Sequence, residues 1–416
     1  MFALKAAAAA VRALAAIAGL FAGRHDGIVL ISCQGNEPSQ DIMDLAEALR
    51  ALPDAPYVYV TAGRMRRSAG GAFSFLVRMF SMLRQISGAR VVVIDAYCPA
   101  VSIPKKRPGQ KVVQLWHAPE AIKKFSLQIV DTPAGYSNKT TKILRMHKGY
   151  DYILCPSSAT RPFFSESFGY PESAFVKFGL PSLDRIGRLR RPAAGETEDP
   201  ERAAARSAIY RKYPALAGEG RRPLTVVFAP AFRDGAPVDA EGLVRAFSEA
   251  LTAAEPKGLA GEDTDAKGQP DITLVLKLHP LDALTLGRFE TAGINLISDK
   301  EFPLINWYAA ADVIVTDYSG VVVEAAAAGV ASYYYIYDMD DFAARRGINV
   351  DLREEATGKY AFIDAAALAA QMIHDFTGNF SYDYDALAAF ARKYLEVPLF
   401  DNTKRLAAFI SECRVC

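Results

Sequence analysis

Short apolar runs alternate with polar and helix-forming segments along most of the chain. The runs are rich in valine and isoleucine, and they are continuous rather than alternating. Continuous apolar runs of this length are typical of parallel strands that helices cover on both faces. The pattern therefore predicts an α/β fold built on parallel sheets. The expected strands span residues 28–32, 57–61, 91–95, 112–116, 152–155 and 175–178, and then 224–228, 272–278, 294–297, 312–316 and 331–336.

The strands fall into two series, which indicates two domains. Helix-forming segments such as 41–52 and 73–86 separate the strands of the first series. Between residues 188 and 223 the composition shifts to Arg, Pro, Ala, Gly and Glu, and no strand is expected there. We therefore predict two doubly wound domains that face a central cleft. The expected divisions are an N-terminal helix (1–24), a first α/β domain (25–190), a linker (191–223), a second α/β domain (224–390) and a C-terminal helix and tail (391–416).

Composition limits the classes of function. Apolar residues make up 51% of the 416 residues and charged residues 23%, as in ordinary globular proteins. The net charge of +1 argues against broad polyanion binding, and aromatic residues are not interleaved with basic ones as in nucleic-acid modules. We therefore expect no nucleic-acid partner. The five cysteines are scattered, and the terminal pair Cys413 and Cys416 has no second pair nearby, so we expect a reducing cytosol and no metal site.

The segment 316–320 (Thr-Asp-Tyr-Ser-Gly) is the most informative stretch of the sequence. It follows an expected buried strand and precedes a helix-forming segment. Backbone N–H groups at a helix N-terminus attract phosphate, and ligands of α/β proteins collect at the carboxyl ends of strands. Asp317, Ser319 and Gly320 are therefore candidates for binding a phosphate group. The alternative is an ordinary helix start in which Ser319 or Asp317 is the cap.

Two further turns of the second series share this design. One follows the expected strand 224–228 and contains Arg233, and the other follows residue 276 and contains Lys277 and His279. If the strands are parallel, these side chains and the Ser319 turn converge on one edge of the sheet. There they would hold a diphosphate and stabilise charge on a leaving phosphate. The alternative is three unrelated loops.

The first series has its own candidate in His117, directly after the expected strand 112–116. Histidine titrates near neutral pH, so it can accept a proton from an attacking hydroxyl group. The alternative is a structural histidine beside Trp116. His25 and His147 have no comparable setting, and we expect them at the surface or in caps.

Basic residues recur in the first series. They are either solvated faces or a surface that binds anionic lipid or a diphosphate, which would suit an acceptor at a membrane. The group consists of Arg64, Arg66, Arg67, Lys105, Lys106, Arg107, Lys139, Lys142, Arg145 and Lys148.

The N-terminal segment is apolar and alanine-rich, but Lys5 and Arg12 interrupt it. The uninterrupted stretch 13–23 is too short to span a bilayer, which needs about 20 residues. The segment also has the pattern of a signal peptide, which would place a nucleotide-type site outside the cell. We expect instead a helix that either packs on the protein or lies on the inner surface of the cytoplasmic membrane.

Taken together, these segments resemble the CDP-glycerol glycerophosphotransferase family, which includes teichoic acid primases and polymerases. The similar segments keep the family's order between about residues 90 and 365. They are 114–117 (Gln-Leu-Trp-His) with Lys123 and Lys124, 178–184 (Phe-Gly-Leu-Pro-Ser-Leu-Asp), 228–233 (Phe-Ala-Pro-Ala-Phe-Arg), 277–280 (Lys-Leu-His-Pro), 316–319 (Thr-Asp-Tyr-Ser), and 335–338 (Tyr-Ile-Tyr-Asp) followed by 345–347 (Arg-Arg-Gly).

The resemblance implies a GT-B-like fold and transfer of a polyol phosphate from a CDP-activated donor to an acceptor hydroxyl, with release of CMP. The polyol phosphate would be glycerol phosphate or ribitol phosphate, and the product a cell-surface polymer such as teichoic acid or capsule. The first domain would hold a lipid-linked or glycan acceptor, and the second domain the donor. By position, His117 would be the catalytic base, and His279 would hold the donor diphosphate with Arg233 and the Ser319 turn.

The expected donor site also includes Lys277, Asp317 and Gly320. Glu324 would either reach a ribose hydroxyl or give buried support to the turn. No carboxylate cluster has clear metal-ligand spacing, so we expect no obligatory metal, while Mg²⁺ on the donor diphosphate is compatible with the scheme. Three residues depart from the family's usual pattern: Ala118, Ser182 and Gly320, which stand where Gly, Arg and Ser are common.

Two alternatives stay open at this point. A GT-B glycosyltransferase that moves a sugar from a nucleotide sugar would use the same fold and a similar phosphate site. A protein that binds a nucleotide without turnover is the second alternative, and the joint presence of His117, His279 and Arg233 argues against it. Release of CMP from one CDP-polyol would distinguish the three.

Overall fold

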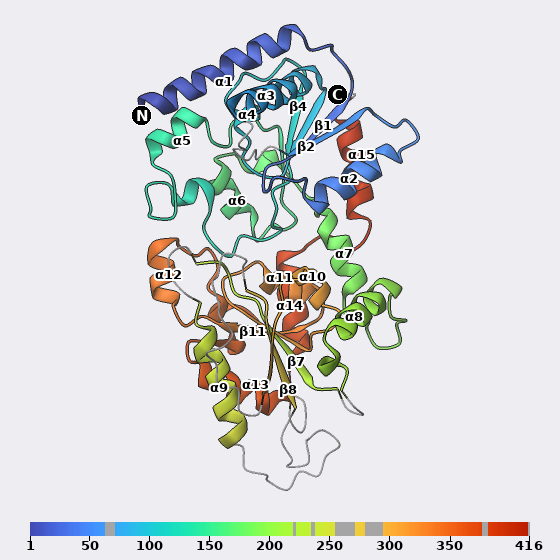
Figure 1. Cartoon of the computed structure of the whole chain (residues 1–416), viewed down its shortest axis with the longest axis vertical. Helices are drawn as coiled ribbons and strands as arrows, with labels where there is room; N and C mark the ends of the chain where they lie inside the picture. The colour runs from blue at the N-terminus through green and yellow to red at the C-terminus, as the bar shows by residue number, and fades with distance from the viewer. Residues whose placement is uncertain are drawn as a thin grey trace. The chain divides into compact units, whose positions relative to one another are not determined.

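The computed structural model describes residues 1–62, 71–218, 222–233, 238–253, 271–278, 294–376 and 382–414. The chain forms two compact units, each with its own parallel sheet. The first unit comprises Met1–Asp184 and Tyr394–Cys416, and the second comprises Arg185–Lys393. The C-terminal end of the chain therefore returns to the first unit (Figure 1).

The sheet of the first unit has six parallel strands in the order β2-β1-β3-β4-β5-β6. The strands are β1 Ile28–Ser32, β2 Val58–Ala62, β3 Val91–Ile94, β4 Lys111–Gln114, β5 Tyr152–Leu154 and β6 Phe175–Val176. Every residue of β1 and β3 is buried, as expected for central strands covered on both faces. The strands lie where the apolar runs predict them, although β3 to β6 end one or two residues early.

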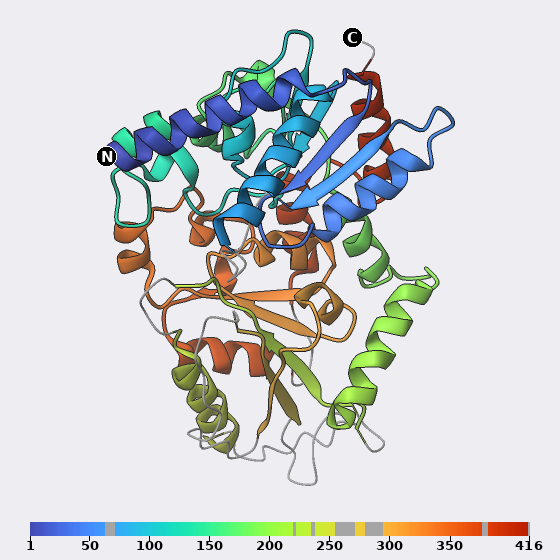
Figure 2. The same ribbon diagram turned by 45° about the horizontal axis from the view of Figure 1, so that its top comes forward.

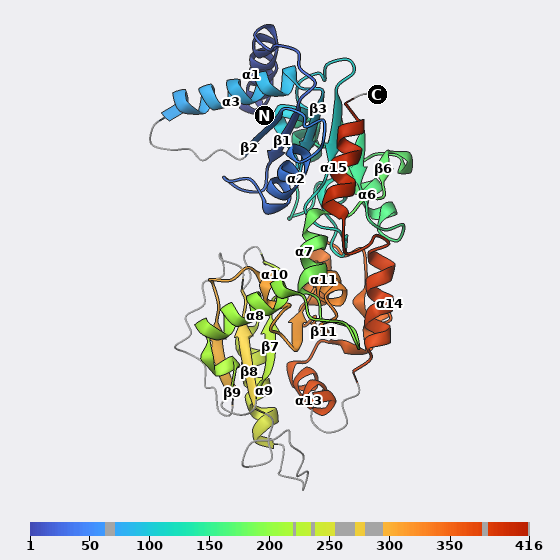
Figure 3. The same cartoon turned by 90° about the vertical axis from the view of Figure 1, so that its right-hand side faces the viewer.

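Helices cover both faces of this sheet. They are α1 Phe2–Leu20, α2 Gln40–Arg50, α3 Gly71–Gly88, α4 Pro99–Ser102, α5 Asn138–Leu144, α6 Arg161–Phe168 and α15 Asn402–Glu412, with 3₁₀ turns η1 Ser126–Ile129 and η2 Glu172–Ala174. Val29 and Ile31 of β1 join the core formed with α3, α4 and α6. Ile28 and Leu30 point to the opposite face and join the core formed with α2 and α15. There α15 lies beside α2 (Figure 3).

The N-terminal helix α1 crosses α3 on the outside of the first unit (Figure 2). Ala18 is fully buried in the core that contains Met82 and Leu83 of α3, whereas Phe2 and Leu20 are 87% and 83% exposed. Within the described part of the chain, α1 is the one helix with the length and composition to cross a membrane, and 11% of its most apolar stretch is buried. The full helix Phe2–Leu20 therefore has the length and composition needed to cross a membrane, whereas the uninterrupted run 13–23 alone is too short. A signal sequence would meet the same criterion.

The sheet of the second unit also has six parallel strands, in the order β12-β11-β10-β7-β8-β9. They are β7 Leu224–Phe228, β8 Ile272–Leu276, β9 Ile294–Ser298, β10 Val313–Thr316, β11 Ala331–Tyr335 and β12 Ala361–Phe362. The helices and 3₁₀ turns are α7 Pro181–Leu189 at the boundary of the units, α8 Pro200–Lys212, η3 Pro214–Leu216, α9 Ala240–Ala253, α10 Leu304–Trp307, α11 Val321–Ala327, α12 Met339–Arg345, η5 Leu352–Glu354, η6 Gly358–Tyr360, α13 Ala365–Phe376 and α14 Tyr384–Tyr394. The two-residue edge strand β12 was not predicted, because it is too short to form a recognisable apolar run.

In both sheets the direction of strand order reverses at one place. The first sheet extends from β1 to β2 on one side and from β3 to β6 on the other. The second extends from β7 to β9 on one side and from β10 to β12 on the other. Ligands of doubly wound proteins bind at the carboxyl ends of the strands that flank such a switch point. The doubly wound α/β class is confirmed, and it places the candidate sites after β1 and β3 and after β7 and β10.

Candidate active site

Asp95 organises the switch point of the first unit. It directly follows β3 and is 1% exposed. Its Oδ2 accepts hydrogen bonds from Ser32 Oγ (2.7 Å) and Ser39 Oγ (2.9 Å), and its Oδ1 accepts one from the Cys33 backbone N–H (2.7 Å). The carboxylate therefore holds the turn after β1 against the end of β3.

The turn that carries His117 has an unusual backbone. Trp116 has φ 60°, in the left-handed region that bulky residues avoid at a cost of order 1–3 kcal/mol. Two sets of contacts hold it there. Its N–H donates to Gln114 Oε1 at 2.9 Å, and its ring packs against Phe125 and Phe168 with centroids 5.0 and 5.2 Å away. The strained residue follows the end of β4 and changes the direction of the backbone just before His117.

The imidazole of His117 is oriented for proton transfer. Its Nδ1 lies 3.2 Å from the backbone oxygen of Asp95, and its ring lies over Trp116 with centroids 4.1 Å apart. A proton on Nδ1 would be donated to that carbonyl, which leaves the lone pair on Nε2. Neighbouring protein atoms desolvate the ring and lower the pKa of His117, although the Asp95 carbonyl opposes this shift. A neutral imidazole with a defined tautomer is the form that a general base requires.

His147 differs from its expected place at the surface. It is 2% exposed, its Nδ1 lies 3.2 Å from Tyr150 Oη, and its ring packs edge-on against Trp116. Burial lowers the pKa of His147 to about 3, so it is a neutral structural residue. Its neighbours come from several segments, so the sequence around it carries no sign of burial.

Glu120 is a feature of the same turn that the sequence did not single out. It is 7% exposed, and its Oε2 is buried without a hydrogen-bond partner in the described part of the chain. Burial raises the pKa of Glu120, while its own backbone N–H and the charge of Lys123 oppose the shift. The signal in the sequence was an acidic residue three positions after the candidate base.

In the second unit, Arg233 joins the turns after β7 and β10. Its side chain is 3% exposed, and its Nη1 lies 2.6 Å from Asp317 Oδ2. Its Nε and Nη2 donate to the two carboxylate oxygens of Asp338 at 2.6 and 2.9 Å, and Nη1 also donates to the Ala231 carbonyl at 2.9 Å. Burial lowers the pKa of Arg233, but the hydrogen bonds and charges of Asp338 and Asp317 outweigh this and leave it raised.

These contacts define what Arg233 can do. They use four of the five guanidinium N–H groups, and two carboxylates face one positive charge. Asp317 is 1% exposed and also accepts from the backbone N–H groups of Ala231 (2.8 Å) and Ser319 (3.2 Å). Arg233 and Asp317 therefore hold the two turns together, and their direct contact with a ligand stays a prediction.

Ser319 and Gly320 remain accessible at the start of α11. Both are partly exposed, and Ser319 Oγ lies 3.5 Å from the Val321 backbone N–H, a long capping contact. Glu324, within α11, accepts a hydrogen bond from Tyr308 Oη at 2.9 Å. This hydrogen bond agrees with the structural role expected for Glu324, and its contact with a ribose hydroxyl stays a prediction.

Lys277 follows β8 and is also paired. Its Nζ lies 3.1 Å from Asp299 Oδ2, and its side chain is 15% exposed. Asp299 further accepts hydrogen bonds from Tyr213 Oη (2.7 Å) and Trp307 Nε1 (2.8 Å). Burial raises the pKa of Asp299, but these hydrogen bonds outweigh it and the pKa is lowered. Asp299 therefore stays ionised and holds the ammonium of Lys277.

The structure thus brings together the turns that contain Arg233 and Ser319. Lys277 follows β8, which pairs with β7, and its N–H donates to the carbonyl of Phe228 at the end of β7 at 2.9 Å. Lys277 therefore begins beside the turn that contains Arg233. His279 lies outside the described residues, as do Arg64, Arg66 and Arg67. Among the residues that are described, no group of three or more His, Cys, Asp or Glu side chains could hold a metal ion.

Known proteins share both the sequence pattern and the fold. Residues 16–412 match the family CDP-Glycerol:Poly(glycerophosphate) glycerophosphotransferase. The chain is 25% identical over 395 residues to the teichoic acid ribitol-phosphate primase of Bacillus spizizenii, across 95% of this chain and 93% of that protein. It is 24% identical over 261 residues to the teichoic acid glycerol-phosphate primase of Bacillus subtilis, across 62% of this chain and 59% of that protein.

Among solved structures, the wall teichoic acid polymerase TagF matches with a TM-score of 0.67 and 18% identity, over 94% of this chain and 90% of that chain. The UDP-GlcNAc 2-epimerase of Neisseria meningitidis matches with a TM-score of 0.54 and 10% identity, over 92% of this chain and 100% of that chain. At these identities the likeness concerns the fold, and it agrees with the predicted GT-B-like class. Because the family match extends over nearly the whole sequence, this chain belongs to the CDP-glycerol:poly(glycerophosphate) glycerophosphotransferase family.

Proposed function

We propose that the protein transfers glycerol phosphate or ribitol phosphate from a CDP-activated donor to an acceptor hydroxyl, with release of CMP. The product would be a teichoic-acid-like wall polymer or a capsule. The observation that carries this proposal is the family match over residues 16–412. The geometry of the His117 turn supports it, because a base with an oriented lone pair stands at a strand end where ligands bind.

In the proposed reaction, Nε2 of His117 takes the proton of the acceptor hydroxyl. The acceptor oxygen then forms a bond to the β-phosphorus of the donor. The bond between that phosphorus and the bridging oxygen breaks, and its electron pair leaves with CMP. Such a phosphoryl transfer depends mainly on positioning and on stabilisation of charge.

The donor diphosphate is proposed to bind at the turns of the second unit. The N–H group of Gly320 and the hydroxyl of Ser319 would face its phosphates, with Arg233 and Asp317 holding the turn in place. Lys277 and, by its place in the sequence, His279 would supply positive charge or hydrogen bonds beside it. The scheme requires no bound metal, and Mg²⁺ that arrives on the donor diphosphate is compatible with it.

The acceptor is proposed to be lipid-linked or a glycan, and the enzyme to act in the cytoplasm at the inner face of the cytoplasmic membrane. Support comes from α1, whose outer face exposes Phe2, Ile17 and Leu20. Apolar side chains on the outside of a helix with basic residues are typical of helices that lie in a membrane surface.

The first experiment is to measure CMP release by the purified protein with CDP-glycerol, CDP-ribitol and nucleotide sugars, each with and without a lipid-linked or glycan acceptor. Acceptor-dependent CMP from one CDP-polyol would support the proposal and identify the donor. Turnover with a nucleotide sugar alone would assign the protein to the glycosyltransferases instead. Donor binding without turnover under any condition would support the binding-protein alternative.

The role of His117 is tested with His117→Ala. We expect a loss of turnover of about 10²–10⁴-fold, because a positioned general base contributes that much, with unchanged donor binding. The matched control is His374→Ala, since the His374 side chain is 76% exposed on α13 of the other unit. Loss of donor binding in His117→Ala would move this residue to the donor site.

A further inference from the structure

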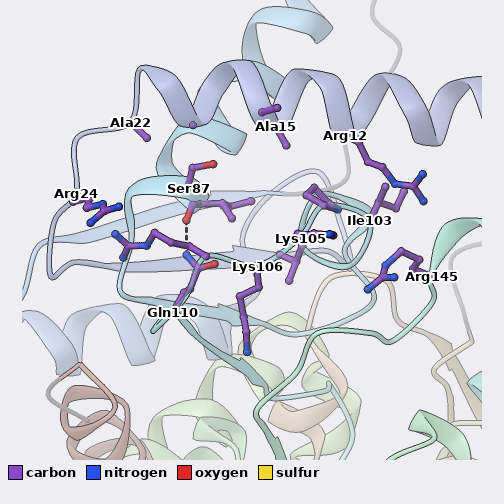
Figure 4. Close-up of a pocket in the computed structure, with 16 residues that line it drawn as sticks. Arg12, Ala15, Ala22, Arg24, Ser87, Ile103, Lys105, Lys106, Gln110 and Arg145 are labelled. Atoms are coloured by element: carbon purple, nitrogen blue, oxygen red, sulfur yellow. Dashed lines mark hydrogen bonds between the residues drawn. The ribbon is translucent and has the colours of Figure 1, made fainter.

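The first unit contains a cavity between α1 and the loop after α4, which we call the α1 cavity (Figure 4). Its volume is about 680 Å³, within the range of small-molecule sites, ~300–1,000 Å³. Helix α1 forms one wall, and the segment 103–107 with Arg145 forms another. None of the described residues that line it belongs to the His117 turn, so the cavity is separate from the candidate base.

The α1 cavity is strongly basic. Six of its described lining residues carry positive charge and none is acidic: Arg12, Arg24, Lys105, Lys106, Arg107 and Arg145. Lys106 is paired with Asp151 at 2.6 Å. Arg12, Arg24 and Lys105 have no ion pair among the described residues. Figure 4 shows Arg24 at one end of the cavity and Arg12 with Arg145 at the other. A cavity with such an excess of charge is suited to an anion.

Arg107 carries the clearest sign of an absent partner. Its Nη2 donates to the Ala89 carbonyl at 2.9 Å, but its Nε is buried without a hydrogen-bond partner in the described part of the chain. Burial lowers the pKa of Arg107, and the nearby charges of Arg24 and Arg90 lower it further, while the charge of Asp26 opposes the shift. A buried donor without an acceptor is costly, and an anion in the cavity would offset the repulsion among the positive charges around this side chain.

Apolar side chains from both walls also line the cavity. Helix α1 contributes the small residues Ala15, Ala16 and Gly19, and Ala22 follows the end of the helix; these residues leave room beneath it. Ile86, Val101 and Ile103 add larger apolar side chains. A ligand that contacts both the basic and the apolar residues of the cavity needs an anionic group together with an alkyl chain, which inorganic phosphate lacks.

We propose that the α1 cavity binds a phosphate-bearing amphiphile, with its phosphate on the basic residues and the first part of its alkyl chain along α1. Two sources have this chemistry: an anionic phospholipid of the bilayer and the diphosphate end of a lipid-linked molecule. The exposed apolar residues of α1 would lie in the same membrane surface from which the ligand enters. The proposal does not depend on the transferase reaction, and binding can be measured without a donor.

The first test is sedimentation of the full-length protein with vesicles of phosphatidylcholine, with and without phosphatidylglycerol. Arg12→Ala combined with Lys105→Ala should weaken binding to the anionic vesicles by about 25-fold, since each basic side chain near such a surface is worth about fivefold. The control pair is Arg50→Ala with Lys404→Ala, which removes two exposed charges from α2 and α15, across the sheet. Equal losses in both pairs would overturn the proposal in favour of general charge attraction.

A second variant changes the shape of the cavity but no charge. A Cβ at Gly19 would lie 3.9 Å from Ser87 Oγ, an ordinary contact, so Gly19→Ala fits. Gly19→Leu places a larger side chain in the cavity, and both changes favour the helix. We expect Gly19→Leu to weaken binding to anionic vesicles at least fivefold relative to Gly19→Ala. Equal binding of the two variants would overturn the proposal, because an open cavity would then be unnecessary.

Soluble ligands identify the source. Calorimetric titration would compare dihexanoylphosphatidylglycerol below its micelle concentration, farnesyl diphosphate and inorganic phosphate. Tighter binding of either amphiphile than of inorganic phosphate, lost in Gly19→Leu, supports the proposal, and the tighter of the two shows which source the cavity prefers. Inorganic phosphate that binds as tightly as both amphiphiles, or no binding of any of the three, contradicts it.

Discussion

Replacing Arg233 by methionine tests whether its ion pairs hold the turns of the second unit. Methionine retains much of the apolar stem, but it leaves Asp317, which is 1% exposed, as a buried carboxylate without its cation at 2.6 Å. Asp338 loses a two-pronged contact at the same time. Removal of one partner from a buried ion pair costs about 3–5 kcal/mol. We expect the free energy of unfolding of the second unit to fall by that amount.

The two tryptophans of the sequence make this measurement specific. Trp116 lies in the first unit and Trp307 in the second, where it is fully buried. In a Trp116→Phe background, urea unfolding followed by tryptophan fluorescence therefore reports on the second unit alone. The matched control is Arg353→Met, which breaks the exposed pair with Asp351 in the same unit and should cost less than about 1 kcal/mol.

Two results would refute the reasoning. A loss below about 1 kcal/mol for Arg233→Met would place its ion pairs in the class of surface pairs. The second test adds Asp317→Asn and Asp338→Asn to Arg233→Met, which removes the buried negative charges. The combined variant should recover part of the lost stability. If it is no more stable than Arg233→Met, uncompensated charge is not the source of the cost.

The remaining predictions concern the first unit. Because the pKa of His117 is lowered, kcat/KM should stay constant as pH falls through about 6.5 and decline only at lower pH; a pH–rate profile that declines above this value would contradict the assignment. Lys123→Ala should move that decline to higher pH, since the charge of Lys123 contributes to the lowered pKa of His117. Glu120 has a raised pKa when folded, so the protein should lose stability as pH rises from about 4.5 through that pKa. Glu120→Gln should remove this dependence, and urea unfolding of both proteins at several pH values would measure it. If the free energy of unfolding depends on pH in the same way in both proteins, the burial of an unpaired carboxyl group is contradicted.

The apolar runs sufficed to predict β1 to β11 and their parallel arrangement, because a strand covered on both faces must be apolar at consecutive positions. The same reasoning located His117 and Ser319, since each follows such a run within a few residues. It did not reveal the return of α15 to the first unit. An amphipathic pattern shows that a helix has an apolar face, but it does not show which sheet that face covers.

The tertiary structure decided which of the candidate charges are compensated. Arg233 is neutralised in part by Asp338, which is 105 residues away, and Lys277 by Asp299, 22 residues away. In the sequence, a basic residue next to a strand end is a candidate for binding a ligand. The structure shows whether a carboxylate from a distant segment already pairs with it. The sequence by itself determined which chemical groups stand at the strand ends, because local apolar patterns set where strands stop. Only the fold determined which of those groups are engaged by other residues, because electrostatic and hydrogen-bond partners depend on distance in space.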